Sequence, residues 1–166
     1  MTRKLTRCAL FAAMMALCAW IGLPLGHTVF TMQTFGVLLA LGILGGKRGT
    51  ISILCYLLLG AAGLPVFSGF RGGIGAILGP TGGYLWGFLA TGLVFWLLEK
   101  WSRPAARIAG ILVCYVCGTV WYMTYTGGAL AAVRAQTVLP YLIPDAVKLV
   151  LALRLTKRLK KMSTAL

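Results

Sequence analysis

Residues 8–46 read CALFAAMMALCAWIGLPLGHTVFTMQTFGVLLALGILGG, a stretch without any Asp, Glu, Lys or Arg. A helix needs about 20 mostly apolar residues to cross a membrane, so this stretch is long enough for two crossings. Pro24 and Gly26 lie between its two apolar halves and predict a break there. The stretch therefore predicts membrane-spanning helices over about residues 5–23 and 31–45.

The whole chain of 166 residues has this apolar character. Residues of the set AVILMFWYC make up 60%, charged residues make up 11%, and the mean hydropathy is +0.91. A soluble globular protein is about half apolar and about one quarter charged. The composition therefore excludes a soluble enzyme, a secreted domain, a coiled coil and a disordered tail. It predicts an all-α integral membrane protein.

Four further apolar segments complete the predicted architecture of six transmembrane helices in a single domain, residues 1–166. They cover about residues 50–62, 81–101 and 105–124, and a last helix that begins between 140 and 144 and ends near 161. Residues 46–49 read Gly-Lys-Arg-Gly and predict a tight polar turn. Residues 63–73 form a glycine-rich loop, and residues 129–139 predict a short amphipathic segment.

The charges predict the orientation of the chain. It has 16 Lys and Arg against 2 Asp and Glu, a net charge of +14. With six spans, 13 of the 16 basic residues fall on one side: Arg3, Lys4, Arg7, Lys47, Arg48, Lys100, Arg103, Arg107, Arg154, Lys157, Arg158, Lys160 and Lys161. The positive-inside rule makes this side cytoplasmic. We therefore expect a multi-pass protein of the cell membrane with both termini in the cytoplasm, and lipid headgroups rather than nucleic acid as the partners of the positive charge.

The two acidic residues differ in their surroundings. Glu99 lies at the cytoplasmic end of a predicted helix, next to Lys100, and is interpreted as an interfacial charge. Asp145 precedes Lys148 by three residues near the start of the last helix, a spacing that puts both on one helix face. Charges within a membrane are costly and favour a protein or water environment. The pair fits a structural ion pair or a ligand-recognition pair, and we favour recognition.

Four other residues are candidates for ligand contact. Arg71 stands in Gly-Phe-Arg-Gly-Gly, where its guanidinium could hold a carboxylate or face solvent. The neighbouring Gly73 would let the backbone approach a ligand closely. Gln33 could hydrogen-bond a ligand or another helix, and Tyr84 could offer a ring wall or a hydroxyl group. Glycines 75, 79, 83 and 87, spaced by four, favour helix packing over ligand contact.

The first predicted helix carries small residues at helical spacing, namely Ala9, Ala12, Ala13 and Ala16. Such a stripe could pack inside the bundle or against another membrane protein. The chain has no phosphate-binding loop, no pair of histidines for a metal and no convincing nucleophile and base. We therefore expect no metal, no cofactor and no enzymatic activity.

Five segments, taken in order, resemble the BioY family, the biotin-specific substrate-binding (S) components of energy-coupling factor (ECF) transporters. The segments are Phe30-Thr-Met-Gln-Thr34, Gly63-Leu-Pro-Val-Phe67, Gly72-Gly73, Gly79-Pro-Thr-Gly-Gly-Tyr84 and Pro144-Asp-Ala-Val-Lys148. They span nearly the whole chain. Each segment alone is modest, but the ordered set is specific. Two departures stand out: similar sequences often carry a glycine between the proline and the aspartate, and residues 129–139 match poorly.

The resemblance implies six helices around an outward-facing cavity, covered by the loops between helices 1 and 2 and between helices 3 and 4. It implies biotin as the ligand, without a cofactor, and as partners a transmembrane coupling protein and two cytoplasmic ATPase subunits. Asp145 and Lys148 would bind the biotin head, with Tyr84 close by, and the alanine stripe would dock the coupling protein. The charge of Arg71 suits the carboxylate of the biotin side chain.

Three alternatives remain at this point. The chain could be an S component for another vitamin, against which the ordered motifs argue. It could be a membrane-embedded enzyme that uses Asp145 and Lys148, which substrate turnover would reveal. It could also be a scaffold subunit in which this pair is only structural and no small molecule binds.

Overall fold

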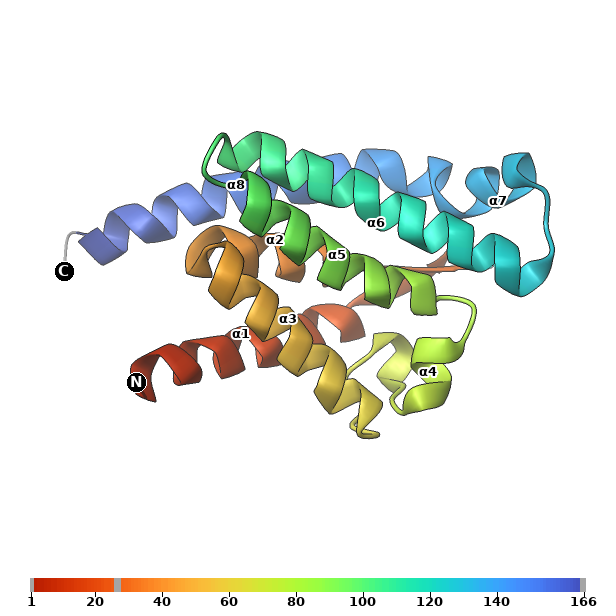
Figure 1. Cartoon of the computed structure of the whole chain (residues 1–166), viewed down its shortest axis with the longest axis horizontal. Helices are drawn as coiled ribbons and strands as arrows, with labels where there is room; N and C mark the ends of the chain where they lie inside the picture. The colour runs from red at the N-terminus through yellow and green to blue at the C-terminus, as the bar shows by residue number, and fades with distance from the viewer. Residues whose placement is uncertain (1, 26–27, 165–166) are drawn as a thin grey trace.

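The computed structural model of the chain describes residues 2–25 and 28–164. Six long helices make up most of it (Figure 1): α1 Thr2–Trp20, α2 Gln33–Leu44, α3 Gly46–Ala61, α5 Gly82–Leu98, α6 Arg103–Thr126 and α8 Leu139–Thr164. The shorter elements are β1 Gly22–Leu25, β2 Thr28–Thr31, η1 Ser68–Phe70, α4 Ile74–Leu78 and α7 Leu130–Thr137. The prediction of six long helices and of a short helix before the last one is confirmed for these residues.

An antiparallel hairpin forms the break between the first two helices, and the predicted break at Pro24 is confirmed. β1 pairs with β2 in a register that places Gly22 opposite Thr31, and the N–H of Met32 donates to the carbonyl of Ile21 at 3.0 Å. The second helix, predicted to begin at about Thr31, begins at Gln33, because Thr31 completes this ladder. Strands of four residues offer too few positions for an alternating pattern to be visible in the sequence. The part of the predicted break at Gly26 lies outside the described residues.

The predicted polar turn at residues 46–49 is the first turn of α3. Gly45, with φ of 80°, provides the break before it. The Oε2 atom of Glu99 accepts a hydrogen bond from the N–H of Gly46 at 3.0 Å. Negative charge stabilises the N-terminus of a helix. Glu99, interpreted above as an interfacial charge, therefore also caps α3.

Helices α5 and α6 lie side by side in the centre of Figure 1, and glycines bring them together. A Cβ atom on Gly83 would lie 2.2 Å from the Cβ of Trp121, and one on Gly87 would lie 2.9 Å from the Sγ of Cys114. Larger residues at these positions would force the helices apart. The prediction of a packing role is thus confirmed for these two glycines.

Helix α1 packs against α2 and α3, and this contact divides the alanine stripe. Ala12 and Ala16 are 2% and 6% exposed and belong to the hydrophobic core. Ala9 and Ala13 lie on the exposed side of the helix. The prediction that all four alanines dock a partner is therefore wrong for Ala12 and Ala16, because the bundle itself covers them.

Arg107 points into the bundle, so the prediction that lipid headgroups are the partners of the basic residues is wrong for it. It is 3% exposed, and its Nη2 donates to the Oγ1 of Thr156 on α8 at 3.0 Å. Gly42 of α2 makes room for it, since a Cβ there would lie 1.9 Å from Nη2. This arginine therefore joins α2, α6 and α8.

Among the described helices, α6 is both long and apolar enough to cross a membrane, judged by length and composition. Helices α2 and α5 are apolar but shorter. Many large apolar side chains on the outside of the bundle are exposed, among them Leu97, Leu112 and Val116. An apolar surface of this kind fits contact with lipid.

Candidate ligand-binding site

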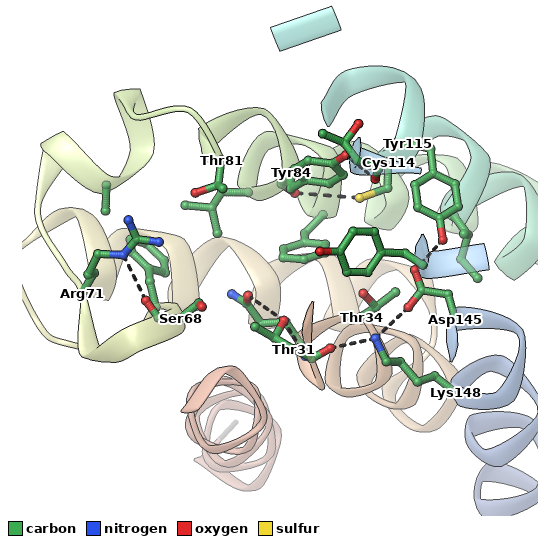
Figure 2. A pocket seen from close by; sticks show the side chains of 18 residues that line it. Thr31, Thr34, Ser68, Arg71, Thr81, Tyr84, Cys114, Tyr115, Asp145 and Lys148 are labelled. Carbon is green, nitrogen blue, oxygen red and sulfur yellow. Dashed lines mark hydrogen bonds and ion pairs between the residues drawn. The ribbon is translucent and has the colours of Figure 1, made fainter. Parts of the chain in front are cut away.

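A cavity opens between the hairpin, the segment that joins α3 to α5, and helices α2, α5, α6, α7 and α8. The space inside it that the centres of water-sized molecules can occupy is about 110 Å³, several times what one water molecule needs. Figure 2 shows the 18 residues that line it. They include Asp145, Lys148, Arg71, Tyr84 and Gln33, so the cavity collects five of the six residues predicted to contact a ligand.

The Asp145 and Lys148 side chains form an ion pair at the α8 end of the cavity. Lys148 Nζ lies 2.7 Å from Asp145 Oδ1, and the two residues are 4% and 6% exposed. The predicted spacing on one helix face is therefore confirmed. Lys148 Nζ also donates to the backbone carbonyl of Thr31 at 2.7 Å and lies 3.9 Å from the centroid of the Phe30 ring. The lysine thus ties the hairpin to α8.

Tyr115 of α6 completes this polar cluster, and the sequence analysis missed it. Its hydroxyl group donates to Asp145 Oδ2, while Lys148 holds Oδ1 (Figure 2). Removing one partner from a buried ionic group costs several kcal/mol, so a carboxylate at this depth needs such donors. In the sequence, a tyrosine hydroxyl group within the apolar segment of α6 was the one sign that this position needs a polar partner.

Tyr84 lines the cavity through its ring. Its hydroxyl group donates to the backbone carbonyl of Thr137 at 2.9 Å, which joins α5 to α7. Of the two predicted roles, the ring wall is the one that this geometry supports.

Gln33 is buried and lines the cavity, but its amide group is engaged by protein. Its Nε2 donates to the Tyr56 hydroxyl group, which in turn donates to the carbonyl of Val66 at 3.0 Å. Gln33 Oε1 accepts from Thr31 Oγ1 at 3.3 Å. Of the two alternatives for Gln33, the bond to another helix is present, and its contact with a ligand stays a prediction. The chain of bonds fixes the segment after α3.

Arg71 and Ser68 lie at the other end of the cavity (Figure 2). Arg71 Nε donates to the backbone carbonyl of Ser68 at 3.1 Å, and the N–H of Phe67 donates to the carbonyl of Arg71 at 2.9 Å. Gly73 is not among the lining residues. Its φ is 84°, and its N–H donates to the carbonyl of Gly60 at 2.7 Å, so its evident role is to shape the loop.

Apolar side chains separate the two polar ends, among them Phe67, Leu85, Phe88 and Ile111. The described residues contain no group of three or more His, Cys, Asp or Glu that could hold a metal ion. The arrangement fits a ligand with an apolar body and a different polar group at each end. Asp145 supplies hydrogen-bond acceptors, and Lys148 and Arg71 supply donors and positive charge.

Comparisons with known proteins all point to the same family. The sequence profile of the BioY family matches residues 1–165. The biotin transporter BioY of Thermotoga maritima is 39% identical over 165 residues, which cover 96% of this chain and 97% of the relative. A probable biotin transporter BioY of Pyrococcus horikoshii is 39% identical over 158 residues, 95% of this chain and 96% of the relative.

A solved structure has the same fold. The crystal structure, at 2.1 Å, of the S-component for biotin from an ECF-type ABC transporter superposes with a TM-score of 0.88. The two sequences are 28% identical, and the superposition covers 96% of this chain and 92% of the other.

Proposed function

The chain belongs to the BioY family, and from this premise we propose that it binds biotin with high affinity and moves it across the membrane as the substrate-specific S component of an ECF-type ABC transporter. Its relatives are transporters, so it is a membrane protein and not an enzyme. We expect biotin as the ligand and no cofactor.

The observation that carries this proposal is the polarity of the cavity, with a polar group at each end of an apolar middle. Biotin has the matching layout, with a ureido group on a fused ring at one end and a carboxylate at the other. The ureido group carries two N–H donors and one carbonyl acceptor, and leaving these unpaired in a dry site would be costly. Asp145 would accept from an N–H group, and Lys148 would donate to the carbonyl.

Arg71 would face the carboxylate of the biotin side chain. The chain has two acidic residues, and neither is the counter-ion of Arg71: Glu99 caps α3, and Asp145 pairs with Lys148. A ligand carboxylate would therefore neutralise this arginine in a geometry suited to two parallel hydrogen bonds. The rings of Phe67 and Tyr84 would pack along the apolar part of biotin.

In the membrane, the six long helices would all cross the bilayer. Both termini would lie in the cytoplasm, where most of the basic residues gather, and the cavity would open to the outside. The hairpin and the segment between α3 and α5 would cover the bound ligand.

The remaining subunits would be a transmembrane coupling protein and two cytoplasmic ATPases. The exposed small residues Ala9 and Ala13 give α1 a surface against which another membrane helix can pack closely. ATP hydrolysis in the partners would drive the loaded subunit to reorient and release biotin inside.

Uptake of labelled biotin tests the proposal. Cells that express the chain with a coupling module should accumulate biotin, and cells with the module alone should not. Ala13→Trp should abolish uptake but leave biotin binding by the purified protein unchanged, because the substitution lies on the outer face of α1 away from the cavity. Uptake that persists in Ala13→Trp would remove this face from the docking surface, and equal uptake with and without the chain would refute the transport function.

A further inference from the structure

Ser68 lines the ligand cavity, and its hydroxyl oxygen is a buried polar atom without a partner. Two buried side-chain polar atoms lack a hydrogen bond among the residues that the structure describes, and Ser68 Oγ is the one at the cavity; the other is Arg107 Nε. Buried polar atoms are almost always paired with protein or water, so each exception calls for an explanation, and one at a cavity can be a group that a ligand would pair.

The position of Ser68 supplies that explanation. Its backbone carbonyl accepts from Arg71 Nε at 3.1 Å, so this short loop holds the hydroxyl group and the guanidinium next to each other. Figure 2 shows both at the end of the cavity away from Asp145 and Lys148. This end therefore offers a hydroxyl donor and a positive charge, with no acidic residue of the chain to satisfy either.

We propose that Ser68 is a specificity-determining residue, whose hydroxyl group donates to one oxygen of the ligand carboxylate while Arg71 binds the other. This inference rests on the proposed function and deepens it. The side chain can turn about its Cα–Cβ bond between staggered positions. Because Oγ gives up no hydrogen bond when it turns, it can meet an arriving carboxylate at little cost.

The subsite selects ligands with a free carboxylate. A hydrogen bond to a charged acceptor is about twice as strong as one to a neutral acceptor. Biotinamide, in which a neutral amide replaces the carboxylate, should therefore gain less from Ser68 than biotin does. The result is a preference for biotin over its amides that depends on one hydroxyl group.

The experiment is a calorimetric titration of biotin and biotinamide into the wild-type protein and the Ser68→Ala variant. We expect Ser68→Ala to weaken biotin binding roughly tenfold or more and biotinamide binding by clearly less, so the preference for biotin falls. Equal losses for both ligands, or no loss for either, would overturn the assignment. If the wild-type protein bound neither ligand, the proposed function itself would fail, and the inference with it.

The melting temperature of the ligand-free protein separates binding from structure. Ser68→Ala removes an unpaired hydroxyl group, so we expect the melting temperature to stay the same or to rise. The matched control is Ser52→Ala, because Ser52 is also buried but its Oγ donates to the carbonyl of Cys8 at 2.7 Å. This control should lower the melting temperature and leave the preference for biotin unchanged. A fall with Ser68→Ala as large as with Ser52→Ala would mark Ser68 as structural and contradict the proposal.

Discussion

The two ends of the cavity are built in opposite ways. At the α8 end, both carboxylate oxygens of Asp145 accept hydrogen bonds, and Lys148 donates to Asp145 and to the hairpin. At the other end, the Arg71 side chain donates a hydrogen bond to the backbone of its own loop, and the Ser68 hydroxyl group has no hydrogen-bond partner among the described residues. The first end is complete without a ligand, whereas under the proposed function the second would gain its partners from the ligand. Rigid helices carry the preorganised end, and an irregular loop carries the end that binding completes.

The largest expected effect tests the preorganised end. Asp145→Asn removes the charged acceptor for the ligand and leaves Lys148 buried without a counter-ion, a change that lowers the free energy of unfolding by about 3–5 kcal/mol in comparable buried pairs. We expect the protein to fold with a lower melting temperature, and biotin affinity to fall on the order of a hundredfold, because a hydrogen bond to a charged group contributes about 1.5–3 kcal/mol. Calorimetric titration and thermal circular dichroism would measure the two effects.

The chain's other acidic residue provides the control for this variant. Glu99→Gln should leave biotin affinity unchanged and lower the melting temperature slightly, because Glu99 caps α3 far from the ligand. Unchanged affinity in Asp145→Asn would remove Asp145 from the binding site.

A smaller effect tests the open end. Arg71→Met keeps an apolar stem of similar length but removes the charge that would face the ligand carboxylate. We expect a loss of biotin affinity of roughly tenfold to fiftyfold and an unchanged melting temperature, since no acidic residue of the chain pairs with Arg71. Arg134→Met is the matched control, because Arg134 is an exposed basic residue of α7 that does not line the cavity. If the two variants bound biotin equally well, Arg71 would not contact the ligand carboxylate, and the proposed difference between the two ends of the cavity would be wrong.

The smallest effect tests how the preorganised end is held. Tyr115→Phe removes the donor to Asp145 Oδ2 and keeps the ring. We expect biotin affinity to fall about fivefold, the worth of one modest hydrogen bond. Tyr115 acts through Asp145 as a positioning residue, so the double variant with Asp145→Asn should bind no more weakly than Asp145→Asn alone. Additive losses in that double-mutant cycle would mean that Tyr115 contacts the ligand directly.

The parts of this molecule that follow periodic rules were predictable from sequence. Length and apolar character gave the six long helices, and the spacing of Asp145 and Lys148 on one turn gave their ion pair. The ordered motifs gave the family. These signals depend on residue type and spacing along a single helix, which the sequence displays directly.

The parts that depend on contacts between elements were not predictable. Tyr115 of α6 donates a hydrogen bond to Asp145 of α8, and no spacing in the sequence indicates that these two helices bring the side chains together. The split of the alanine stripe follows from which side of α1 packs on α2 and α3. The proposed role of Ser68 depends on a loop with φ of 69° at Gly69 and 56° at Phe70, which no periodicity encodes.

The most direct test of the central claim is a calorimetric titration of biotin into the detergent-purified wild-type protein, with thiamine and riboflavin as controls. The proposed function predicts tight one-to-one binding of biotin and no binding of the other two vitamins. A folded sample that gives no heat of binding with biotin, or that binds thiamine or riboflavin instead, would contradict it.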